Sequence, residues 1–181
     1  MQFSFKNKTG ALLPFLKEVE FYLLERLYGN SNLGTLLMRG KYILIEMCTN
    51  GIKHSGEAYS QFNIDIEDDK LFISKIDKGN PFTPKSKNGM ACLVFPPQNL
   101  QTYKPVTIWE DDLNRLAVKK ASEDTLVFYV EDINEPAPEL ASLLEKHLGL
   151  IIICRAADVL HYKYEPEQKL NIFTAKLQVV S

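Results

Sequence analysis

The order of apolar and polar positions divides the chain into short alternating segments and longer stretches with helical spacing. Residues 2–6 alternate polar and apolar, which is typical of a half-buried strand. Between residues 12 and 27 the apolar side chains recur every three or four positions, which predicts an amphipathic helix. A second helix is predicted from about residue 33 to residue 53, because its apolar residues form one continuous stripe.

Two pairs of alternating segments predict β-hairpins. Residues 62–66 and 71–76 flank the polar turn at 68–70. Residues 160–164 and 170–177 alternate around the second turn, at 165–168. We therefore expect two antiparallel strand pairs, far apart along the chain.

The remaining segments complete an α+β pattern. A further strand is predicted at residues 125–130, and helices at 139–147 and 150–160, separated by Gly149. Residues 77–105 are rich in proline and are expected to be mostly loop. Helices together with hairpins predict a two-layer α/β sandwich, in which helices cover a mixed, mainly antiparallel sheet.

Composition excludes several classes of protein. The chain has 181 residues, 45% of them hydrophobic and 24% charged, which predicts a single domain spanning 1–181. A formal net charge of −2 argues against binding to nucleic acid or a membrane through bulk charge. The N-terminus does not have the pattern of a signal peptide, and the apolar run 148–157 is too short to span a bilayer. We expect a cytoplasmic location.

The three cysteines support the same expectation. Cys48, Cys92 and Cys154 are widely spaced and form neither a CxxC pair nor a cluster with histidines. This usage predicts reduced thiols in a cytoplasm rather than a disulfide framework or a structural metal site.

The second predicted helix carries an unusual set of polar side chains. Glu46, Asn50, Lys53 and His54 lie at positions i, i+4, i+7 and i+8, so they share one helical face. A carboxylate and an amide one turn apart, beside two potential cations, could form a catalytic or binding site. A solvated helix face is the simpler alternative.

Two glycine-containing segments are further candidates. Asp77 follows a predicted strand and could accept a hydrogen bond from an amino group, while Gly79 would let a flat ligand approach the backbone. Gly149 precedes an apolar helix whose first backbone N–H groups could bind an anion. Taken singly, the first segment could be an ordinary turn and the second a corner between helices.

In this order the three segments resemble the GHKL (histidine-kinase-like) ATPase superfamily, with its Bergerat ATP-binding fold. Within the superfamily they are most similar to the bacterial anti-sigma-factor serine/threonine kinases. Glu46 with residues 50–55 resembles the N box, and residues 77–84 resemble the D-x-G-x-P-F-[DT]-P box. Residues 147–150 resemble the G-L-G-L box, and the similarity covers about 2–88 and 145–178.

The resemblance implies ATP and Mg²⁺ as cofactors, and it implies roles for the helical residues. Asn50 would coordinate the Mg²⁺ that bridges the phosphates. Glu46 would be the general base, or would orient the attacking hydroxyl or water. Lys53 and His54 would approach the phosphates or the lid.

It also implies roles for residues at the sheet and at the last helix. Asp77 would accept a hydrogen bond from the adenine amino group, with Gly79 beneath the base. Gly149 and the N–H groups after it would cradle phosphate. Asn171, in the last strand, would support Asp77 directly or through a water.

The function implied is that of a regulatory protein in signal transduction. It would control a protein partner, such as a sigma-factor-like or antagonist protein, by phosphorylating a Ser or Thr or by nucleotide-dependent binding. Relatives in this branch are commonly homodimers, so a homodimer is a further expectation. No direct contact with nucleic acid or a membrane is expected.

Two departures from the family pattern keep alternatives open. His147 replaces the first glycine of G-L-G-L, and residues 85–146 are much longer than the lid of this branch, so this insertion should carry secondary structure of its own. One alternative is a histidine-kinase-like catalytic domain, although the first helix has no phosphoacceptor histidine. The other is a degenerate, non-catalytic interaction protein that docks through residues 90–140.

Overall fold

The structure is a computed structural model of the chain, and it describes residues 1–83, 105–110, 113–122, 124–133 and 148–179. The first half of the chain contains β1 (Gln2–Lys6), a short 3₁₀ turn (Thr9–Ala11), α1 (Leu12–Arg26), α2 (Leu33–His54), β2 (Tyr59–Glu67) and β3 (Lys70–Lys78). The second half contains β4 (Val106–Glu110), β5 (Asn114–Lys120), β6 (Thr125–Asp132), α3 (Leu148–Ala156), β7 (Val159–Glu165) and β8 (Leu170–Gln178).

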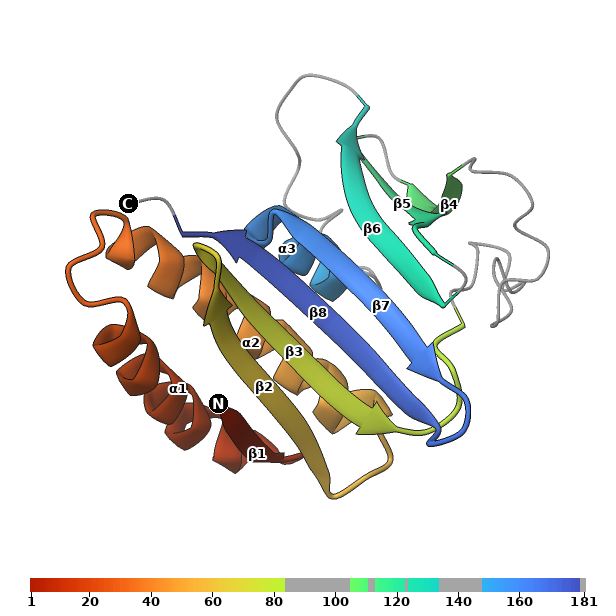
Figure 1. Cartoon of the computed structure of the whole chain (residues 1–181). Coiled ribbons are helices and arrows are strands. Elements are labelled where there is room, and N and C mark those ends of the chain that lie inside the picture. Colours follow the sequence, from red (N-terminus) through yellow and green to blue (C-terminus); the bar gives the residue numbers. More distant parts are fainter. Residues whose placement is uncertain (84–104, 111–112, 123, 134–147, 180–181) are drawn as a thin grey trace.

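The described strands form one sheet in the order β1-β2-β3-β8-β7-β6-β5-β4. Every strand pair in this described sheet is antiparallel. The expectation of a mixed sheet was therefore wrong, and the expectation that it is mainly antiparallel was right. Figure 1 shows the helices on one side of the sheet. The predicted α+β architecture, with a helical layer on a sheet, is therefore confirmed.

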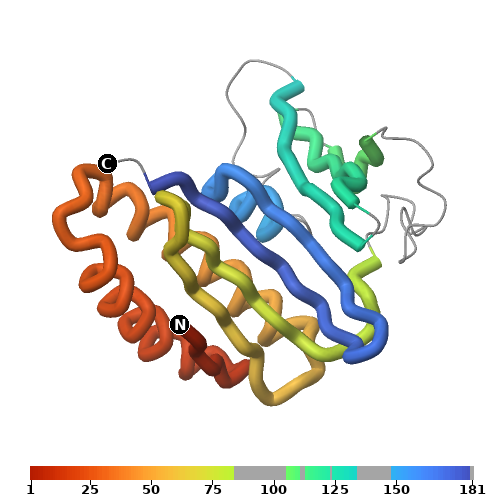
Figure 2. Tube along the Cα trace, viewed as in Figure 1, coloured from red at the N-terminus to blue at the C-terminus, as the bar shows by residue number. Residues whose placement is uncertain are grey.

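The sheet is joined at its centre by strands that are distant in sequence. β3 pairs with β8 along its whole length, from Lys70↔Gln178 to Lys78↔Leu170. Figure 2 shows the yellow-green trace of β3 beside the dark blue trace of β8. The two predicted hairpins, β2–β3 and β7–β8, are thus placed edge to edge.

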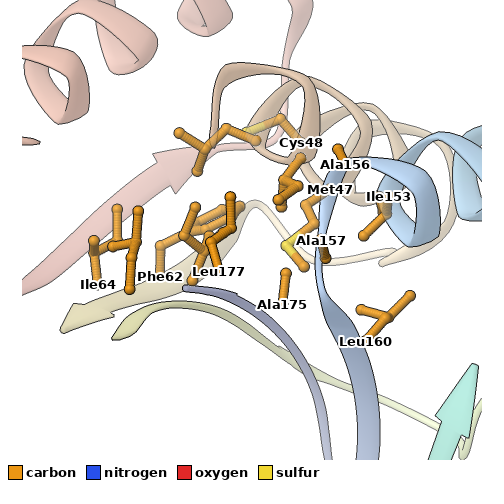
Figure 3. Close-up of a cluster of buried hydrophobic side chains, with 14 of the residues drawn as sticks. Met47, Cys48, Phe62, Ile64, Ile153, Ala156, Ala157, Leu160, Ala175 and Leu177 are labelled. Carbon is orange, nitrogen blue, oxygen red and sulfur yellow. The ribbon is translucent and has the colours of Figure 1, made fainter. Parts of the chain in front are cut away.

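The core lies between the helices and the inward-facing residues of the strands. At the β1 end, the rings of Phe5, Phe15 and Phe62 lie with centroids 5.0–6.4 Å apart, and all three are nearly inaccessible to solvent. Figure 3 shows the neighbouring part of the core, where Met47 of α2 and Ile153 of α3 lie above the sheet. Because α2 and α3 share this core, burial of apolar surface holds the two helices together.

A polar contact fixes the end of α3 against α2. Arg39 of α2 donates hydrogen bonds to the carbonyl oxygen of Ala156 at 2.7 Å and to Asp158 at 2.6 Å. A cation at a helix C-terminus satisfies carbonyl groups that have no partner within the helix. The C-terminal end of α3 is thereby held against the first half of α2.

The predicted boundaries around α3 need correction. The helix spans Leu148–Ala156, so Gly149 lies in its first turn and does not break a helix, and β7 begins at Val159. The end of the predicted helix was wrong because Leu160, Tyr162 and Tyr164 alternate into the core as strand residues. The predicted helix at 139–147 lies outside the described residues.

The insertion carries secondary structure, as predicted, in the part that the structure describes. β4, β5 and β6 form a meander, and β6 pairs with β7 from Thr125↔Lys163 to Phe128↔Leu160. The strand predicted at 125–130 is β6. These residues of the insertion extend the main sheet.

We predict that Phe62→Ala lowers the free energy of unfolding by about 3–5 kcal/mol, because it leaves a cavity among the three phenylalanine rings. Phe21 of α1, which is 64% exposed, provides the matched control. Phe21→Ala should change that free energy by less than about 0.5 kcal/mol. Urea denaturation followed by circular dichroism measures both, and equal effects would contradict the packing described.

Candidate functional site

Three of the predicted site residues meet where α3 crosses α2. Glu46 and Asn50 lie one turn apart on α2, and Gly149 is in the first turn of α3. A Cβ atom on Gly149 would lie 2.7 Å from Glu46 Oε2 and 3.7 Å from Asn50 Oδ1. The absence of a side chain at Gly149 therefore lets the start of α3 approach the carboxylate and the amide.

The carboxyl group of Glu46 is partly withdrawn from solvent. Burial raises the pKa of Glu46 above its ordinary value, and the nearby Lys53 ammonium opposes this shift. Lys53 and His54 are both exposed in the last turn of α2. Lys53 is thus a cation close enough to act on Glu46, whereas the structure shows no specific contact for the described side chain of His54.

Asp77 lies at the end of β3, opposite Asn171 of β8 in the strand register. Its side chain is 11% exposed, and its Oδ2 atom forms an ion pair with Lys75 Nζ. The other oxygen, Oδ1, is buried and has no hydrogen-bond partner in the part of the chain that the structure describes. An unsatisfied buried carboxylate oxygen is costly, so it marks a position where a ligand donor would be stabilised.

Asn171 holds the segment that follows Asp77. Its Nδ2 donates to the carbonyl oxygen of Asn80 at 3.0 Å, and its Oδ1 accepts from the Phe82 backbone N–H at 3.1 Å. The Tyr162 hydroxyl donates to the same Oδ1 at 2.7 Å. Asn171 therefore supports the loop after Asp77, whereas the expected support was for Asp77 itself.

Glycine is required at one position of this loop. Gly79 has φ = +150°, a conformation that residues with a Cβ rarely adopt, and its N–H donates to the carbonyl oxygen of Lys169 at 2.9 Å. The chain can thus turn directly after Asp77 and remain attached to the β7–β8 turn. Gly79 is exposed, so its backbone is accessible to a ligand.

A partly buried polar cluster, which the sequence pattern did not reveal, lies beneath the C-terminal part of α2. Ser60 Oγ donates to Asn7 Oδ1 at 2.9 Å, and Asn7 Nδ2 donates to Ser55 Oγ at 2.8 Å. A Cβ on Gly51 would lie 2.8 Å from Asn7 Oδ1, 2.9 Å from Ser60 Oγ and 3.2 Å from Lys75 Cε. The sequence contained one signal for this cluster, because Lys75 falls where the alternation of β3 predicts an apolar, buried residue.

The remaining expectations concern His147, the cysteines, and possible metal sites or membrane spans. His147 and Cys92 lie outside the described residues, so nothing tests the effect of the altered G-L-G-L box. Cys48 and Cys154 are free thiols, and burial raises the pKa of each to about 12. In the described ranges, no three His, Cys, Asp or Glu side chains gather as a metal site, and no helix there could span a membrane.

The chain was compared with known proteins through models of protein families and through curated proteins. Neither comparison finds a match.

We predict that Gly51→Ala lowers the free energy of unfolding by about 1–3 kcal/mol, because a methyl group would overlap Asn7 and Ser60. Gly34, in the first turn of the same helix, has nothing within 4 Å of its Cβ position and is the control. Gly34→Ala should leave stability unchanged or raise it by up to about 1 kcal/mol. Thermal and urea unfolding measure both variants, and a neutral Gly51→Ala would argue against the close packing at α2.

Proposed function

We propose that this protein is a Mg-ATP-binding regulator with the GHKL (Bergerat) fold, similar to the anti-sigma-factor serine/threonine kinases. The observation that carries the proposal is the buried Oδ1 atom of Asp77, which lacks a partner among the described residues. It lies at the end of a strand, beside a glycine with exposed backbone. The adenine amino group is a donor that would satisfy this oxygen.

The other end of the site supports the same proposal. Asn50 offers an amide oxygen and Glu46 a carboxylate, and oxygen atoms of these kinds are the ligands that Mg²⁺ accepts. Asn50 would hold the ion, which, when bound, neutralises charge on the phosphates. Gly149 of α3 lies against Glu46 and Asn50, and the backbone N–H groups of this turn would bind phosphate oxygens.

Glu46 is suited to the role of general base. A raised pKa makes a carboxylate a stronger proton acceptor, provided that the pH stays above that value. Glu46 would accept the proton of a Ser or Thr hydroxyl as that oxygen bonds to the γ-phosphorus and the bond from the γ-phosphorus to the bridging oxygen breaks, releasing ADP. Lys53, which acts on Glu46 electrostatically, would favour the ionised form at neutral pH.

The regulated partner is proposed to be a protein, either a sigma-factor-like protein or its antagonist. The net charge of −2 supports a protein partner over nucleic acid. The described strands of the insertion, β4–β6, extend the sheet beyond β7 and would offer an additional surface to such a partner.

We predict that the wild-type protein binds ATP with Mg²⁺ saturably at or below millimolar concentration, measured by isothermal titration calorimetry. Asp77→Ala and Asn50→Ala should each weaken binding at least about tenfold. The first removes the carboxylate that would accept a hydrogen bond from adenine, and the second removes the amide oxygen that would coordinate Mg²⁺. Asp65→Ala, in an exposed ion pair with the N-terminal amine, is the control and should bind as wild type does. Absence of saturable binding by wild type would rule out the proposed function.

Catalysis is tested separately from binding. Glu46→Gln keeps the shape of the side chain but removes its basicity, so it should bind ATP within about threefold of wild type and lose phosphoryl transfer at least about a hundredfold. Transfer is measured with radiolabelled ATP and the candidate partner, or as ATP hydrolysis. Equal turnover by both proteins would show that Glu46 is not the base.

A further inference from the structure

Lys75 occupies a core position that normally belongs to an apolar residue. Along the helix-facing side of β3, Leu71 and Ile73 are fully buried, and Lys75 is only 5% exposed at the next position. Lysine is rarely buried to this degree, since a charge in the interior is costly unless it is paired. A buried lysine immediately beside a candidate ligand-binding carboxylate therefore calls for a functional explanation.

The packing above Lys75 holds its side chain in place. Gly51 of α2 leaves room for the stem, since a Cβ there would lie 3.2 Å from Lys75 Cε. Its ammonium group forms the ion pair with Asp77 Oδ2. An ammonium group has donors and no acceptor, so Lys75 binds the carboxylate as a hydrogen-bond donor, and it does so at Oδ2. Oδ1 has no partner among the described residues and is the carboxylate oxygen left for a ligand.

We propose that Lys75 is a positioning residue that fixes which oxygen of Asp77 faces the base, an inference that rests on the proposed nucleotide binding. By engaging Oδ2, it leaves Asp77 one acceptor atom. A 6-aminopurine presents its exocyclic amino group to that atom and is accepted. A 6-oxopurine presents a carbonyl oxygen at the same position, where it would face the carboxylate oxygen, and is rejected.

Asp77→Asn is nearly isosteric, but it replaces one carboxylate oxygen with an NH₂ group. Because Lys75 can only donate, it would bind the carbonyl oxygen of the new amide and turn its NH₂ group toward the base. The site would then present a donor where the wild type presents an acceptor. The preference should change from the amino to the oxo purine, which would not follow from a general loss of packing.

The experiment measures the dissociation constants of ADP and inosine diphosphate with Mg²⁺ at pH 7 by titration calorimetry. These ligands differ at position 6 and in the protonation of the adjacent N1, and they share the ribose and phosphates. Wild type should prefer ADP by at least about tenfold, because inosine diphosphate would place its carbonyl oxygen against the carboxylate oxygen. Asp77→Asn should prefer inosine diphosphate, because ADP would place its amino group against the NH₂ group of the new amide. In the double variant Lys75→Met with Asp77→Asn, the amide is free to turn, so the reversed preference should disappear.

Lys78→Met, at an exposed lysine on the same strand, is the matched control and should keep the wild-type ratio. The ratio is measured within one preparation, so a partly unfolded fraction does not alter it. If Asp77→Asn weakens both ligands by the same factor, the role of Lys75 is overturned while nucleotide binding stands. If wild type binds neither ligand, the proposed function itself fails.

Discussion

The pairing of β3 with β8 is the constraint on which the rest of the structure depends. The two strands align from Lys70↔Gln178 to Lys78↔Leu170, although they are about a hundred residues apart in sequence. This ladder turns two local hairpins into one sheet and creates a single surface for α2 and α3. It also places Asp77 opposite Asn171, so the end of one strand and the loop after it are held by the other.

The helical layer depends on two close approaches that glycine permits. Gly149 lets the start of α3 lie on Glu46, and Gly51 lets α2 lie over Asn7, Ser60 and Lys75. Both glycines are helical, where glycine costs about 0.5–1 kcal/mol relative to alanine. In return, polar groups at the candidate site can lie beneath and between the helices, where they are partly shielded from water and electrostatic interactions are stronger.

Much of the fold could be predicted from local pattern. The helix stripes, the two hairpins and the strand at β6 are periodic, and periodicity reflects which residues face the core. The site was predicted in part, since Glu46 and Asn50 share a helical face and Asp77 follows a strand. Asn7, Ser60 and Lys75 were missed because they come from three separate segments, and their contacts exist only after the sheet and α2 have packed.

The sequence by itself determined the α+β class, the first two helices, the two hairpins, the strand at β6 and the order of the three candidate segments, because these follow from local spacing. The tertiary structure decided the antiparallel strand order, the use of β4–β6 as an extension of the sheet, and the meeting of Gly149 with Glu46. It also decided that Lys75 engages one oxygen of Asp77 and leaves the other buried without a partner among the described residues. Burial and long-range contact are properties of the packed chain, and no local pattern specifies them.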